Sequence, residues 1–107
     1  MIAFVLRDDK PACVRWEILM HERFSDVWIC KDLGRTTTSA DPVELGRTVL
    51  AAYLAGRDSR GETFRVDVRT DHEVHVVITA DQLLDPGWEA DPAVRRALPA
   101  YLRSALA

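Results

Sequence analysis

Residues 62–79 read ETFRVDVRTDHEVHVVIT, and apolar and charged side chains alternate through them almost without error. A short polar break divides the stretch into two halves that share this pattern. A period of two on both sides of such a break predicts an antiparallel hairpin that is buried on one face and solvated on the other. With a three-residue loop, Arg69 would lie opposite His75, and Asp67 opposite Val77. This hairpin decides the fold class.

Three further strands are predicted before the hairpin, at residues 2–7, 13–20 and 27–31. The first carries apolar side chains on both faces, which is typical of a central or partly covered strand. Helix is the competing prediction for residues 13–24, but their apolar positions fit a period of two better than one of 3.6. A hydroxyl-rich connection is expected at residues 33–40.

If the second and third of these strands pair so that Met20 faces Val27, Cys30 lies beside Glu17 on the polar face. Cys13 then lies near the far end of its strand, so the two cysteines do not meet. Half-buried cysteines without a catalytic role are the simpler interpretation.

Two helices follow from their start signals. Asp41 is a good N-cap and Pro42 fits the first helical position, so a helix is predicted from there to about Arg57. Asp91–Pro92 opens a last helix in the same way. Because Pro99 removes a backbone donor and crowds the preceding turn, that helix is expected to kink or break near it.

A capping box at residues 79–82 predicts a short helical turn between the hairpin and the last helix. The resulting order is β-β-β-α-β-β-α in a single domain, residues 1–107. Its economical packing is an α+β two-layer sandwich, a mainly antiparallel five-stranded sheet with two amphipathic helices on one face. This order resembles the core of type III secretion chaperones, without the helix that usually precedes their first strand. The resemblance is one of topology alone.

Composition places the chain among globular proteins. Its 107 residues are 48% hydrophobic and 29% charged, and no apolar run approaches the ~20 residues that span a bilayer. The first residues lack the basic region and cleavage site of a signal peptide, so we expect neither export nor membrane association. Two cysteines make no disulfide framework and suit a reducing cytoplasm. The excess of arginine over lysine, with abundant alanine, is typical of GC-rich bacterial genomes.

The charge balance argues against a nucleic-acid partner. Fourteen basic and 17 acidic residues give a net charge of −3, and no segment is basic. Arg15, Arg65 and Arg69 would be the contacts with phosphates. Glu17 and Asp67 lie among them in the predicted sheet and would repel those phosphates.

No pattern for catalysis, for a metal or for a cofactor stands out. His72 and His75 are three positions apart, which on a strand sends them to opposite faces, so only the hairpin turn could bring them together. Cys13, Cys30 and the hydroxyls of residues 36–39 lack the surroundings of a known nucleophile. We therefore name no catalytic, cofactor-binding or metal-binding residue.

Strand parity draws attention to the sheet face opposite the helices. The residues predicted to form a partner-binding surface there are Trp28, Arg65, Arg69, His75, Leu19 and Val77. Tryptophan and arginine around an apolar centre are the mixture enriched at protein-binding hot spots. In the alternative interpretation, residues 33–40 or the C-terminal segment cover Trp28 and extend the core. Trp88 is added to the surface as a possible anchor, although it is better placed to dock on the helices.

The sequence thus predicts a non-enzymatic module that binds another protein or a second copy of itself, as a regulatory, chaperone-like or immunity-type inhibitor protein would. The alternative is a small-molecule site or small enzyme, with His21 or His75 as the acid or base and Glu17 or Asp67 as its partner.

Overall fold

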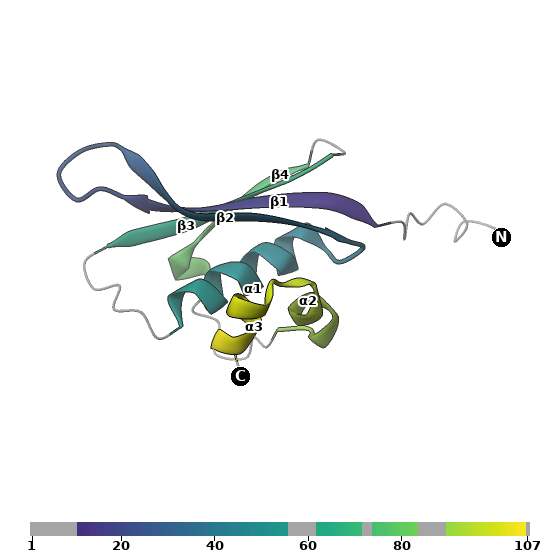
Figure 1. Ribbon diagram of the computed structural model, residues 1–107. Helices are drawn as coiled ribbons and strands as arrows, with labels where there is room; N and C mark the ends of the chain where they lie inside the picture. Colours follow the sequence, from purple (N-terminus) through teal and green to yellow (C-terminus); the bar gives the residue numbers. More distant parts are fainter. Residues whose placement is uncertain (1–10, 56–61, 72–73, 84–89, 107) are drawn as a thin grey trace.

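The computed structural model describes residues 11–55, 62–71, 74–83 and 90–106. Within these ranges, one antiparallel sheet is formed by β1 (Ala12–His21), β2 (Trp28–Thr38), β3 (Thr63–Thr70) and β4 (His75–Thr79). The strand order is β2-β1-β3-β4, so β1 and β3 are central (Figure 1). The further strand predicted at residues 2–7 lies outside the described residues.

Between β2 and β3 the chain forms helix α1 (Pro42–Leu54). After β4 come a 3-10 turn, η2 (Ala80–Leu83), and the helices α2 (Pro92–Ala97) and α3 (Ala100–Ala105). Figure 1 shows all three helices on the same side of the sheet. An α+β fold with an antiparallel sheet is therefore confirmed.

The connection predicted at residues 33–40 is wrong, because β2 continues to Thr38. Cys30 pairs with Leu19 and Asp32 with Ile18, so Lys31 is an extra residue and forms a β-bulge. The bulge lets the second half of β2 pair with the whole first half of β1. Three consecutive β-branched threonines at its end favour this extended backbone.

The register expected between β1 and β2 is also wrong. Met20 pairs with Ile29 rather than Val27, and Cys30 lies beside Leu19 rather than Glu17. The connection spans residues 22–27 rather than the expected 21–26, and this shift of the turn by one residue moves the pairing of the two strands by two residues.

The register of the β3–β4 hairpin is confirmed, with Arg69 opposite His75 and Asp67 opposite Val77. The alternation excludes a slip of one residue, which would turn buried valines outward, and the three-residue loop that was assumed selects this register among the others.

Helices α1 and α2 begin where their caps predict. The Asp41 carboxylate accepts from the Val43 amide at 3.0 Å, and the Asp91 carboxylate accepts from the Ala93 amide at 2.8 Å. The break expected at Pro99 is confirmed, since α2 and α3 are separate helices on either side of it.

The core lies between the inner face of the sheet and α1, with α2 and α3 against α1. Fully buried side chains on the inner face of the strands and on α1 are Val14, Trp16, Ile18, Val66, Val68, Leu45, Val49 and Leu50. All the strand members of this group have even numbers, so the odd-numbered residues of β1 and β3 point away from the helices.

A hydrogen bond joins helix α3 to strand β2. The Tyr101 hydroxyl of α3 donates to the Asp32 carboxylate of β2 at 2.8 Å. Burial raises the pKa of Tyr101 from 10.0 to about 12, and the hydrogen bond and the charge of Asp32 act in the same direction.

This raised pKa predicts a loss of stability in alkali. The unfolded tyrosine ionises near pH 10 and the folded one near 12, so the contribution of Tyr101 is complete below pH 10 and lost as pH rises toward 12. Tyr101→Phe should lower the free energy of unfolding at pH 7 by about 0.5–1.5 kcal/mol. Denaturant titrations between pH 7 and 12 measure both effects. An identical alkaline decline in the wild-type protein and in Tyr101→Phe would contradict the assignment.

Candidate functional site

The candidate site is the sheet face that points away from the helices, here called the outer face. It comprises the odd-numbered residues of β1, β3 and β4 and, from β2, Trp28, Cys30, Leu33, Arg35 and Thr37. No helix of the described residues lies over this face (Figure 1).

Trp28 lies on the outer face together with the arginines of the hairpin, as predicted. It pairs with His21, and its indole ring meets the His21 ring edge-on with centroids 5.0 Å apart. The guanidinium carbon of Arg65 lies 4.3 Å from the centre of the indole ring. Such cation–π contacts hold the indole in one orientation and contribute about 0.5–1 kcal/mol at exposed sites.

Neither of the coverings considered for Trp28 is present in the described residues. Residues 33–38 form β2 itself, and the C-terminal helix α3 lies on the other side of the sheet. The bulge at Lys31 reverses the facing of β2, but only after Trp28. Among the described residues, the half-buried Trp28 contacts His21 and Arg65 on the same face.

The apolar residues of the outer face lie near the indole ring, on β1, and on the two outer strands, β2 and β4. Leu19, only 9% exposed, is flanked by Cys30 and Arg65, its partners on either side. Val77 on β4 is 43% exposed and Leu33 on β2 is 66% exposed. Leu33 had not been predicted there.

Asp67 connects Arg65 with His75, and both were predicted for the surface. Its carboxylate lies 3.0 Å from the Nε atom of Arg65 and 3.8 Å from the Nε2 atom of His75. Arg65 thus touches both the indole ring and a carboxylate, which fixes a long side chain that would otherwise be mobile. The structure therefore brings Trp28, Arg65 and His75 into one connected group.

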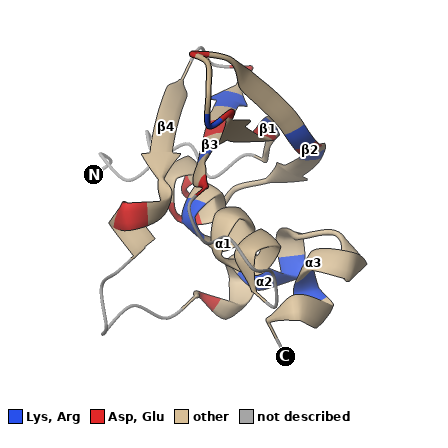
Figure 2. Cartoon of the chain, turned by 90° about the vertical axis from the view of Figure 1, so that its left-hand side faces the viewer, with Lys and Arg blue, Asp and Glu red and all other residues tan. Residues whose placement is uncertain are grey.

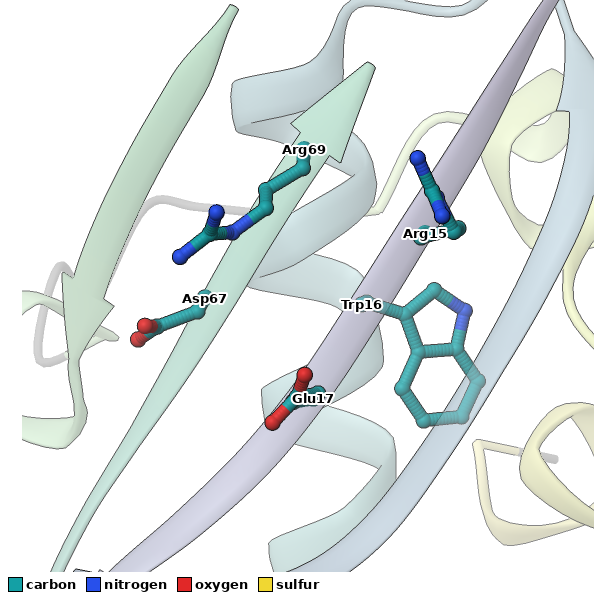
Figure 3. Close-up of a pocket in the computed structure, with 5 residues that line it drawn as sticks. All are labelled: Arg15, Trp16, Glu17, Asp67 and Arg69. Carbon is teal, nitrogen blue, oxygen red and sulfur yellow. The ribbon is translucent and has the colours of Figure 1, made fainter. Parts of the chain in front are cut away.

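Two rows of side chains cross the outer face at right angles to the strands. The basic row is Arg35, Arg15, Arg69 and His75, each directly opposite the next. The acidic row is Leu33, Glu17, Asp67 and Val77. Each of its members lies two residues away from a member of the basic row on the same strand. An open depression of about 410 Å³ lies between the rows, bounded by Arg15, Glu17, Asp67 and Arg69 with Trp16 beneath (Figure 3).

Sequence reasoning missed Leu33 and Arg35, because it treated their segment as a loop. A signal was available in the run Gly34–Thr38, where three β-branched residues follow a glycine and favour a strand. The bulge that turns Leu33 and Arg35 outward leaves no such signal.

The remaining features considered from the sequence add nothing to this candidate site. Trp88 lies outside the described residues, as do His72 and Glu73 of the hairpin turn. In the described residues, no three His, Cys, Asp or Glu side chains are placed to hold a metal ion. Cys13 and Cys30 are free thiols. None of the helices described has the length and apolarity needed to cross a membrane. Figure 2 shows basic positions on the sheet and on α2 and α3, so they are not gathered on one face.

Comparison of the chain with models of protein families, with curated proteins and with solved structures gave no match.

Proposed function

We propose that this chain is a non-enzymatic protein-binding module of the bacterial cytoplasm, and that its outer face contacts another protein or a second copy. A regulatory, chaperone-like or immunity-type inhibitor protein would use such a face. The fold proposed with it is a two-layer sandwich in which residues 2–7 add a fifth strand to the sheet.

The observation that supports this proposal is the cluster of Trp28, Arg65 and Leu19 on a face without a covering helix in the described residues. The indole ring and the guanidinium are held by contacts within the chain, so little side-chain entropy is lost when a partner packs on them. Tryptophan and arginine are the residues that most often dominate binding free energy at interfaces.

The test is the double variant Trp28→Ala/Arg69→Glu. We expect it to stay folded and to lose its protein partner or its self-association, with affinity reduced at least about thirtyfold because hot-spot residues contribute about 2 kcal/mol or more. Circular dichroism checks the fold, and sedimentation velocity with affinity capture checks the assembly. Arg103→Glu, on α3, is the matched control and should change neither. A folded double variant that keeps its oligomeric state and every co-purifying protein rules out this surface.

A small-molecule site is the second candidate, and the depression beside Glu17 and Asp67 is the observation that favours it. A volume of about 410 Å³ is within the range of ligand pockets. His75 Nε2 lies 3.8 Å from the Asp67 carboxylate, which is close but beyond hydrogen-bond distance. His21, by contrast, packs on Trp28. Saturating phosphate or citrate should then raise the melting temperature of the wild-type protein but not of Arg69→Glu. No rise with either anion removes this candidate.

A further inference from the structure

Charges on the outer face are sorted by sign into rows instead of being paired across the strands. Arg15 lies directly opposite Arg35 on one side and Arg69 on the other, and Glu17 lies directly opposite Asp67. Like charges in directly opposed positions destabilise a sheet. This sorting therefore lowers the stability of the isolated chain, and complementary charges from another molecule would offset the repulsion.

Most of these charges are also unpaired within the described part of the chain. Arg15, Arg35, Arg69 and Glu17 form no ion pair there, whereas the Asp67 carboxylate is shared by Arg65 and His75. In Figure 3, Arg15 and Glu17 project from β1, and Asp67 and Arg69 project from β3 toward β4. Among the described residues, the guanidinium groups of Arg15, Arg35 and Arg69 therefore have no carboxylate partner, and a carboxylate of another molecule can pair with them.

We propose that a second copy of this chain supplies these carboxylates, with the two outer faces stacked about a two-fold axis. The inference rests on the proposed function and names its partner. An axis parallel to the rows and midway between them exchanges the basic row with the acidic row. It places Arg15 against the partner's Glu17 and Arg69 against the partner's Asp67. By symmetry each contact occurs twice.

The geometry of stacked sheets suits this arrangement. Sheets that pack face to face are about 10 Å apart and aligned within about 30°, and arginine side chains reach across such a gap. The four charged residues lie on β1 and β3, the two central strands, where a small angle between the sheets displaces them least. At the ends of the acidic row, Leu33 would pack on the apolar stem of the partner's Arg35, and Val77 on the imidazole ring of the partner's His75.

A second copy fits better than a purely acidic partner. A nucleic acid or an acidic peptide would be attracted by the basic row but repelled by Glu17 and Asp67, which lie only two residues along the same strands. A surface that carries both signs in adjacent rows is complementary to itself.

The test uses Arg15→Glu and Glu17→Arg, each in the full chain. Each reversal places like charges against each other at both symmetric contacts, so each variant alone should self-associate at least about tenfold more weakly than the wild-type protein. Mixed in equal amounts, the two should form a heterodimer, because the doubly acidic strand of one faces the doubly basic strand of the other. Sedimentation velocity at low salt measures all three samples, and added salt should dissociate the assemblies.

Misfolding is excluded by the same variants. Arg15→Glu places a carboxylate between Arg35 and Arg69, and Glu17→Arg places a guanidinium beside Asp67, so the melting temperature of each monomer should stay the same or rise. Arg96→Glu, on α2, is the control and should leave the wild-type association unchanged. A wild-type chain that is monomeric throughout, single variants that associate as the wild type does, or a mixture that stays monomeric would each overturn the two-fold pairing. The proposed function is judged separately, by Trp28→Ala/Arg69→Glu.

Discussion

Gly34→Ala is expected to lower the free energy of unfolding by about 1–3 kcal/mol or more, although alanine ordinarily suits a strand better than glycine does. A Cβ atom at Gly34 would lie 2.3 Å from the Cζ2 atom of Trp16 and within 3 Å of two further atoms of that ring. Trp16 is 1% exposed and rigid, so its indole cannot move aside without disturbing the core. Urea titration of both proteins measures the difference.

The matching control is Gly34→Ala in a chain whose Trp16 has been replaced by a smaller residue. Trp16→Leu leaves space beside β2 at its own cost of a few kcal/mol, and Gly34→Ala added to it should cost much less than in the wild-type protein. A full penalty in both backgrounds would contradict the contact. Because Gly34 faces inward only if the bulge at Lys31 is present, the result also tests whether Leu33 and Arg35 belong to the outer face.

Gly46→Ala should likewise destabilise the fold, by about 1–2 kcal/mol, and here the sign itself is informative. Helix propensity alone predicts a gain of about 1 kcal/mol from this change in α1. The new Cβ atom, however, would lie 2.7 Å from the Cγ2 atom of Val68 and 2.8 Å from the Cδ1 atom of Ile78. Overpacking of about 1–3 kcal/mol outweighs the propensity.

Ala51→Gly serves as the propensity control in the same helix, with an expected loss of about 1 kcal/mol. Thermal and urea unfolding of both variants give the comparison. If Gly46→Ala proved more stable than the wild-type protein, α1 would not lie as close to β3 and β4 as the structure has it.

How far the sequence predicts this fold depends on how local each signal is. The register of the β3–β4 hairpin was predicted correctly, because the period-two pattern fixes which residues face the core and the assumed three-residue loop then selects the pairing. The caps at Asp41 and Asp91 and the break at Pro99 were equally local, and all three are confirmed.

The second half of β2 was not predicted, because its pairing depends on a bulge opposite Ile18 and Leu19. A bulge is decided by which register buries more of the two strands together, and no residue type marks it. For the same reason the sequence placed Trp28 and the hairpin arginines on one face but did not show the rows, which need Arg35 and Leu33. Neither did it indicate the bond between Tyr101 and Asp32, which are 69 residues apart.

Hydroxyl-radical footprinting tests the central claim, that the outer face is the contact surface, most directly. The chain is labelled in three samples: at low concentration, at high concentration, and in complex with any protein captured with it. We expect the side chains of Trp28, Leu33 and Val77 to become protected on assembly, while Val43 and Tyr101 on the helices keep their reactivity. Protection of Val43 and Tyr101 with an unchanged outer face would contradict the claim.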